Sequence, residues 1–301
     1  MGQLLTLIKG CIAFSLIVIN TLLWVTPVFI FGLLKLLPIK IWRKLCTHLL
    51  HFFASAWITG NDIIASILHP TNVIIEGDIP SDINDWYMVI ANHQSWVDIL
   101  ILQRIFNRNI PFLKFFLKQE LIYVPVMGLA WWALDFPFMR RYSAAKIKKN
   151  PKLKGKDIEI TRKACQKFKS KPVSVMNFVE GTRFTQAKHS KQQSQFKHLL
   201  KPKAGGMAFA LSALGENINK LVDVTIYYPE KTPSYWQFIS GQVKQVNVHV
   251  KVSDIGDDMK GDYLSNREFK QHFQHQLNDI WQQKDAQLEK YHQQYAKQAK
   301  E

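Results

Sequence analysis

Hydrophobic and polar positions follow three patterns along this chain, and each pattern predicts a different kind of element. Residues 10–34 contain no charged side chain, and this run exceeds the about 20 apolar residues that span a bilayer. Residues 41–68 and the chain from Ser265 onward place apolar residues at helical spacing. Short apolar, β-prone runs predict strands at residues 72–76, 86–91, 173–179, 221–228 and 242–252.

Helices are predicted between these strands, which gives an alternation typical of an α/β sheet. They fall at residues 96–104, 158–168 and 204–214, and a buried or interfacial helix is expected within residues 121–139. We therefore divide the chain into membrane-anchoring helices, an α/β domain, and an amphipathic helix with a Gln-rich, frayed tail. The boundaries of these three parts are 1–69, 70–262 and 263–301.

The first apolar segment is expected to be retained as a membrane helix or a helical hairpin, because it is too long for a signal peptide. Pro27 and Gly32 leave room for a kinked or re-entrant path. Basic residues follow it closely, and the positive-inside rule then places the remaining chain in the cytoplasm. These residues are Lys35, Lys40, Arg43 and Lys44.

Charge and cysteine content indicate which ligands and which kinds of site this chain can be expected to have. The chain has 39 Lys and Arg against 23 Asp and Glu, a net charge of +16 that attracts phosphates on lipids, a coenzyme or nucleic acid. The basic run at residues 140–171 is a solvated surface near anionic headgroups or a docking site for coenzyme phosphates or an acidic carrier protein. RNA binding is not favoured, because only Tyr142 and Phe168 interrupt this run. The three cysteines lack the spacing of a disulfide framework or a zinc site.

The candidate chemistry lies after the strand at residues 86–91, where the sequence continues Asn-His-Gln-Ser-Trp-Val-Asp. On one continuous helix His93 and Asp98 would point about 140° apart and could not meet. If the helix begins at Ser95, Asp98 lies in the first turn and His93 can fold back onto it. An aspartate so placed fixes the imidazole tautomer and leaves a general base. The alternative is a capping box at Ser95 with His93 as an ordinary turn residue.

A second polar cluster, Glu180-Gly181-Thr182-Arg183, follows the strand at residues 173–179. Sites in α/β sheets gather beyond the carboxyl ends of the strands, so the two clusters are expected to lie together. Taken alone, this second cluster could equally be a strand-ending turn with surface charge.

Together these segments resemble the membrane-bound glycerophospholipid acyltransferases, the family that includes bacterial 1-acylglycerol-3-phosphate acyltransferase. Residues 92–98 resemble its His-x4-Asp block, and the second and third blocks follow in the family's order. The likeness is greatest to the YihG-like bacterial branch, although Val179 replaces a proline common before the third block and residues 222–224 replace the proline usual in the fourth. The second and third blocks are carried by Phe138-Met139-Arg140-Arg141 and Phe178-Val179-Glu180-Gly181-Thr182-Arg183, with Lys118, Leu121, Pro125 and Gly128 in the connecting segment and Lys203-Ala204-Gly205-Gly206 in the stretch that follows.

The resemblance implies a mixed sheet flanked by helices and a membrane-bound enzyme of the bacterial inner membrane that faces the cytoplasm. His93 would deprotonate the hydroxyl of a lysophospholipid, most simply 1-acylglycerol 3-phosphate, while that hydroxyl attacks the thioester of acyl-CoA or acyl carrier protein. Asp98 would orient His93, and no metal or bound cofactor is implied beyond this co-substrate. The implied substrate-binding residues are Asn92, Arg141, Glu180, Gly181, Thr182, Arg183 and Lys203.

Other functions stay open at this point. The acceptor could be another lysophospholipid, Ser95 could serve as a nucleophile, or water could replace the acceptor and make the protein a hydrolase. From another class, the chain could be an inactive, basic, membrane-tethered protein that binds nucleic acid or a partner. The sequence contains no G-x-S-x-G elbow, which favours direct transfer over an acyl-enzyme.

Overall fold

A six-stranded sheet forms the centre of the molecule in the computed structural model, which describes residues 2–139, 150, 168, 171–263 and 265–298. The strand order is β1-β8-β7-β2-β6-β3, and only the β7–β8 pair is antiparallel. The strands are β1 Asn72–Gly77, β2 Tyr87–Ala91, β3 Leu113–Phe115, β6 Ser174–Asn177, β7 Lys220–Tyr227 and β8 Gln245–Asp254. A separate parallel pair joins β4 Leu117–Lys118 to β5 Phe138–Met139. The sheet is therefore mixed, as expected.

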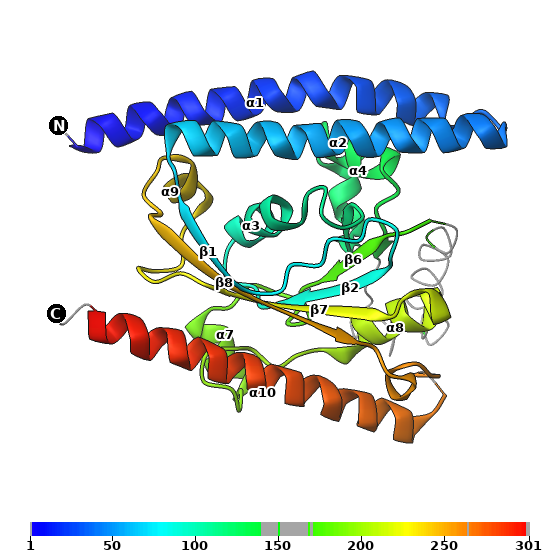
Figure 1. The fold of residues 1–301 in the computed structure, drawn as a ribbon, viewed down its shortest axis with the longest axis vertical. Helices are drawn as coiled ribbons and strands as arrows, with labels where there is room; N and C mark the ends of the chain where they lie inside the picture. Colours follow the sequence, from blue (N-terminus) through cyan, green and yellow to red (C-terminus); the bar gives the residue numbers. More distant parts are fainter. Residues whose placement is uncertain (1, 140–149, 151–167, 169–170, 264, 299–301) are drawn as a thin grey trace.

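Helices cover both faces of the sheet (Figure 1). One face carries α1 Gly2–Leu34, α2 Lys40–Leu68, α3 Val97–Phe106, α4 Met127–Ala133 and α9 Tyr235–Ile239. The other carries α7 Gln186–Gln192, α8 Ala204–Leu214 and α10 Arg267–Gln298. Because successive side chains of a strand point to opposite faces, β2 sends Val89 into the first core and Met88 and Ile90 into the second.

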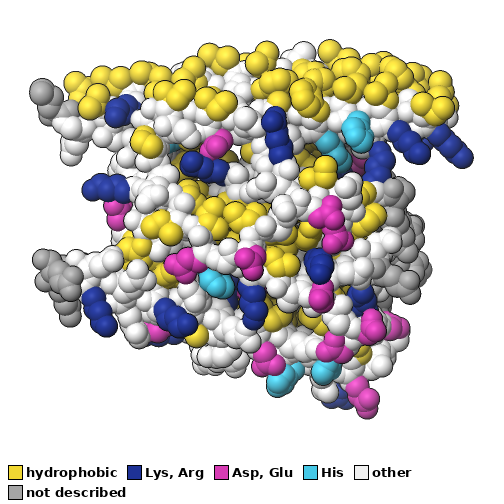
Figure 2. All heavy atoms as spheres, in the orientation of Figure 1, with side chains coloured by type: hydrophobic (Ala, Val, Ile, Leu, Met, Phe, Trp, Pro, Cys, Tyr) yellow, Lys and Arg dark blue, Asp and Glu magenta, His cyan; other side chains and the backbone are white. Residues whose placement is uncertain are grey.

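A hairpin of α1 and α2 lies across the top of the molecule, with the two helices side by side along their length (Figure 1). The first apolar segment forms one continuous helix that includes Pro27 and Gly32, and the hairpin arises because α2 folds back along it. Helix α1 is long and apolar enough to cross a membrane, yet it also contacts α4 and α9 of the domain. Hydrophobic side chains cover the outer side of the hairpin in Figure 2, and Leu5, Leu23 and Ile41 are among those exposed.

The structure confirms the five predicted strands and the helix at residues 204–214, and it corrects two other expectations. Residues 121–139 do not form one helix. Pro125 and Pro137 interrupt the segment, which divides into a 3-10 turn at Gln119–Tyr123, the short α4 and β5. The expected frayed tail is instead helical, because α10 continues to Gln298. The helix expected at 158–168 lies outside the described residues, except for Phe168.

Candidate active site

The ends of three neighbouring strands meet at one edge of the sheet. β2 pairs in parallel with both β6 and β7, so the carboxyl ends of all three lie together. His93 follows β2, the segment Phe178–Arg183 follows β6, and Tyr228 follows β7. The two polar clusters predicted from the sequence therefore do lie at the same edge, and Tyr228 joins them.

His93 and Asp98 are in contact. The Nδ1 atom of His93 lies 2.9 Å from Oδ2 of Asp98, across the turn that leads into α3. The helix begins two residues after Ser95, and the Ser95 hydroxyl oxygen accepts a hydrogen bond from the backbone N–H of Val97 (3.1 Å). Asp98 therefore falls in the first turn, which is the geometry that the predicted contact required.

Asp98 is completely buried and is held from several sides. Its Oδ2 accepts hydrogen bonds from the backbone N–H groups of Gln94 (2.6 Å) and Ser95 (2.9 Å), and its Oδ1 accepts one from the hydroxyl of Tyr228 (2.6 Å). Burial, followed by the charge of Asp98, raises the pKa of Tyr228 well above its usual range. Tyr228 therefore stays a neutral donor, and its hydrogen bond holds the Asp98 side chain in a position that can orient an imidazole.

The imidazole of His93 is held by a stacking contact as well as by Asp98, and its backbone is also bonded. Its ring stacks on Phe178 with centroids 3.9 Å apart and planes 14° apart. The backbone carbonyl of His93 accepts a hydrogen bond from the N–H of Phe184 (2.7 Å). Nε2, the second ring nitrogen, has no hydrogen bond to any residue within the described part of the chain. This nitrogen is the one that can take a proton from a substrate.

Glu180 does not act as the sequence suggested. The side chain is fully buried, and its two carboxylate oxygens accept hydrogen bonds from the backbone N–H of His93 (3.0 Å) and of Leu200 (3.2 Å). Burial raises the pKa of Glu180 to about 8, against the opposing effect of these two bonds. The expected contact with substrate is replaced by a structural one, because Glu180 ties the His93 turn to the segment that precedes α8.

Asn92 is likewise turned away from solvent. Its side-chain amide donates to the carbonyl of Ile226 (2.9 Å), and its side-chain oxygen accepts from the N–H of the same residue (2.8 Å). Both polar groups of the amide are therefore used to join the ends of β2 and β7. The expected substrate contact does not fit this arrangement.

The turn after Glu180 faces the site. Gly181 has a φ of +70°, a conformation that glycine adopts without strain, and its N–H donates to the carbonyl of Phe178 (2.8 Å). Thr182 accepts a hydrogen bond from Lys188 Nζ (2.8 Å). The guanidinium of Arg183 lies 4.9 Å from the centre of the Trp96 ring, which holds the charge at the edge of the site.

Two other predicted residues do not join this group. Lys203 is exposed at the start of α8 and is not among the residues that line the cavity described below. Arg141 lies outside the described residues. Ser95 is a poor nucleophile, because its hydroxyl donates to the carbonyl of Pro233 (2.5 Å) and its proton is committed there.

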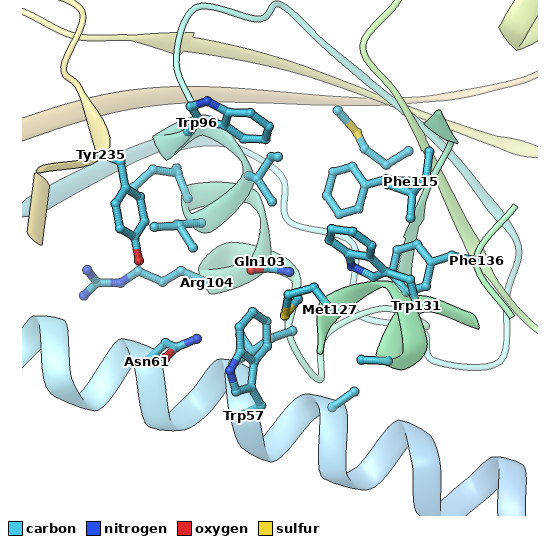
Figure 3. Close-up of a pocket in the computed structure, with 18 of the residues that line it drawn as sticks. Trp57, Asn61, Trp96, Gln103, Arg104, Phe115, Met127, Trp131, Phe136 and Tyr235 are labelled. Atoms are coloured by element: carbon cyan, nitrogen blue, oxygen red, sulfur yellow. The ribbon is translucent and has the colours of Figure 1, made fainter. Parts of the chain in front are cut away.

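A cavity of about 970 Å³ opens beside His93 and runs under the hairpin. Its walls are mostly apolar and aromatic, and they come from α1, α2, α3, α4 and α9 (Figure 3). Trp96 lies on one side of the view, and Trp57 and Asn61 of α2 lie on the opposite side. His93, Lys118, Gly181, Thr182 and Arg183 also line this space. Its size and lining fit a long apolar chain whose polar end lies near His93.

A family model described as Acyltransferase matches residues 72–229, more than half of the chain. The chain belongs to the acyltransferase family. The matched segment of this acyltransferase extends from β1 to just beyond Tyr228 and includes His93, Asp98 and the turn at Gly181. Within the described residues, no group of three or more His, Cys, Asp or Glu side chains could hold a metal ion.

Relatives of this acyltransferase include plant and yeast proteins. The probable 1-acyl-sn-glycerol-3-phosphate acyltransferase 5 of Arabidopsis thaliana is 26% identical over 233 residues, which cover 72% of this chain and 57% of the relative. The 2-acyl-1-lysophosphatidylinositol acyltransferase of Saccharomyces cerevisiae is 26% identical over 249 residues, which cover 68% of this chain and 61% of the relative. The chain thus spans less than two thirds of the length of either protein.

A solved structure shares the fold. The 1-acyl-sn-glycerophosphate acyltransferase PlsC from Thermotoga maritima matches with a TM-score of 0.56 at 18% identity, over 96% of this chain and 98% of that chain. The match includes the hairpin as well as the sheet, because it covers nearly the whole of both chains.

Proposed function

We propose that this protein transfers a fatty acyl group from acyl-CoA or acyl carrier protein to the free hydroxyl of 1-acylglycerol 3-phosphate, which gives phosphatidic acid. The observation that carries the proposal is the His93–Asp98 pair at the edge of a long apolar cavity. The name of the Arabidopsis relative supports 1-acylglycerol 3-phosphate as the acceptor. The sequence runs that resemble the YihG-like branch support a bacterial member of the family.

The reaction follows from the geometry of His93. Nε2 takes the hydroxyl proton of the acceptor while the hydroxyl oxygen bonds to the thioester carbonyl carbon. The carbon–sulfur bond then breaks, and the thiolate leaves with the proton that His93 returns. Asp98 stabilises the imidazolium through Nδ1, because the Tyr228 hydroxyl holds the aspartate side chain against His93. Transfer is direct, since the Ser95 hydroxyl is already bonded to Pro233.

Substrate binding divides between the two ends of the site. Arg183 and Lys118, which line the cavity, and Arg141, which the sequence predicts as a third cation, bind the acceptor's phosphate, and guanidinium groups do so in a forked geometry. The apolar cavity takes an acyl chain. We place Gly181 and Thr182 beside the glycerol part of the acceptor. Both residues line the cavity, and they directly precede Arg183, which we assign to the phosphate.

The hairpin supports a membrane location. We propose that its exposed hydrophobic side lies in the surface of the bacterial inner membrane, with the α/β domain on the cytoplasmic side. The exposed Lys40, Arg43 and Lys44 then lie near anionic headgroups, whereas Lys35 pairs with Asp135 of the domain. Acceptor and product, both membrane lipids, would reach the cavity from the hairpin side.

The test is an acyl-transfer assay with detergent-purified protein, both donors and a panel of lysophospholipids, following free thiol and diacyl product. We expect thiol release that requires 1-acylglycerol 3-phosphate. His93→Ala and Asp98→Asn should each lower kcat by about 10²–10⁴-fold, because they remove the base or its orientation. His275→Ala, at an exposed histidine of α10, is the matched control and should keep full activity.

Three outcomes would contradict the proposal. A preference for lysophosphatidylinositol or another lysolipid would assign a different acceptor, as the name of the yeast relative allows. Thiol release without any acceptor would indicate a hydrolase. No product from either donor, in folded protein, would indicate a basic membrane-tethered binding protein.

A further inference from the structure

A lysine of α7 reaches back to the turn that borders the cavity. The Nζ atom of Lys188 donates hydrogen bonds to Oγ1 of Thr182 and to the backbone carbonyl of Arg183, each at 2.8 Å. Lys188 lies in the first turn of α7, where its backbone N–H donates to the hydroxyl of Thr185 (3.3 Å). This helix cap fixes the position from which the lysine side chain extends to the turn.

The hydrogen bond from Lys188 determines what the Thr182 hydroxyl can do. A lysine ammonium has donors and no acceptor, so Oγ1 of Thr182 is the acceptor in this contact. The hydroxyl also has a proton of its own, and no residue in the described part of the chain accepts it. Thr182 lines the cavity, as do Arg183 and His93. The hydroxyl proton is therefore available to a molecule bound in the cavity.

The chain around this turn is strongly basic. Residues 181–203 contain six Lys and Arg and no Asp or Glu. Glu180, the carboxylate just before them, accepts hydrogen bonds from backbone N–H groups instead. Neither Arg183 nor Lys188 forms an ion pair with a carboxylate of the described residues. Two cations held on one turn repel each other, and a bound anion relieves that repulsion. The turn therefore favours a negatively charged oxygen.

We propose that Lys188 is a positioning residue of the acyltransferase site, which keeps the Thr182 hydroxyl oriented as a donor to an anionic oxygen of the substrate. The inference rests on the proposed function and deepens it. Two such oxygens occur in that reaction: those of the acceptor's phosphate, and the thioester carbonyl oxygen, which becomes negative during the attack. Lys188 does not itself line the cavity, so it acts through Thr182.

The experiment compares Thr182→Val, Lys188→Met and the double variant in acyl transfer by the full-length protein. Thr182→Val keeps the shape of the side chain and removes its hydroxyl. We expect Thr182→Val to lose about 10–100-fold in kcat/KM, as for a lost hydrogen bond to a charged group, and Lys188→Met to lose about tenfold. Lys191→Met is the matched control, because it removes an exposed lysine from the same short helix. It should change kcat/KM less than about twofold.

The double variant shows whether Lys188 acts through Thr182. If it does, Lys188→Met should cost less than about twofold when Thr182→Val is already present. Losses that multiply would show that the two residues act independently, and they would overturn the inference. A merely structural role of Lys188 predicts multiplied losses and a lower unfolding midpoint. Lys188→Gln, which keeps an N–H donor without the charge, replaces Lys188→Met in the cycle if that variant does not fold.

Binding of 1-hexanoylglycerol 3-phosphate, measured by calorimetry without a donor, identifies the oxygen and does not depend on activity. If the oxygen belongs to the phosphate, Thr182→Val and Lys188→Met should each bind this probe about tenfold more weakly, with kcat nearly unchanged. If it belongs to the thioester, binding should be unchanged while kcat falls. Inactive wild-type protein would refute the proposed function, and weaker binding by Lys188→Met would still support the inference. Unchanged binding with no loss of activity in Lys188→Met would overturn it.

Discussion

On one face of the sheet, α1 and α2 lie over a cavity of about 970 Å³, whereas on the other face α10 packs its aromatic side chains directly against the strands. Both faces draw on the same strands: β2 is buried along its whole length and sends side chains to each side. Trp281 and Phe273 of α10 are 0% exposed, but Trp57 and Trp131 border open space.

The two faces of the sheet differ in role: the cavity face has room for a ligand, and the α10 face stabilises the fold. Protein interiors are normally packed to the density of organic crystals, and a face that keeps a large cavity gives up contact energy. The α10 face provides the compensating packing, and it also holds the backbone of the His93 turn through Glu180 and the 197–200 segment. In such a molecule, substitutions on the two faces should have effects of different kinds.

Truncation of a tryptophan on each face tests this difference most strongly. Trp281→Ala should lower the free energy of unfolding by about 3–5 kcal/mol, because it removes a fully buried ring and its hydrogen bond to Leu200. Trp131→Ala should cost less than about 2 kcal/mol, since one side of that ring already faces the cavity. Urea denaturation of both variants in the same detergent measures the two values. Equal losses would show that the cavity face is as tightly packed as the α10 face.

The outer side of the hairpin should matter for membrane binding and not for folding. Leu5 and Leu23 are 55% and 61% exposed, so Leu5→Ser with Leu23→Ser should leave the unfolding midpoint unchanged. The pair should weaken binding to anionic vesicles roughly 30-fold, which corresponds to about 2 kcal/mol of lost apolar burial. Ile83→Ser, at an exposed residue of the loop between β1 and β2, is the control and should bind as wild type. Co-sedimentation with vesicles measures the binding, and an unchanged affinity would refute the proposed membrane face.

Local patterns predicted the strands and the His93–Asp98 contact, because strand, turn and first helical turn are set by neighbouring residues. The cavity could not be predicted in this way, since its walls combine residues of five helices with strand and loop residues between positions 17 and 239. Tyr228 was missed for the same reason, because its partner Asp98 lies 130 residues away.

The sequence analysis also predicted substrate contacts for two polar residues that follow strand ends. Asn92 and Glu180 lie beside His93 in the fold, yet their hydrogen bonds go to the backbone of Ile226, His93 and Leu200. Sequence alone does not distinguish a polar side chain that binds a ligand from one that satisfies buried backbone groups, because both occur where strands end.

The substitution with the smallest expected effect narrows the cavity and leaves His93 and Asp98 unchanged. Ala65 of α2 lines the cavity on the hairpin side, so Ala65→Phe should shorten the space available to an acyl chain. We expect kcat/KM for the longest acyl donors to fall about tenfold, or about 1.4 kcal/mol, while short donors react as before. Ser66→Phe, at the exposed next residue of the same helix, is the matched control and should leave chain preference unchanged. An equal loss with donors of every length would instead show that Ala65 affects the site as a whole, and the cavity would then not be the chain-binding space.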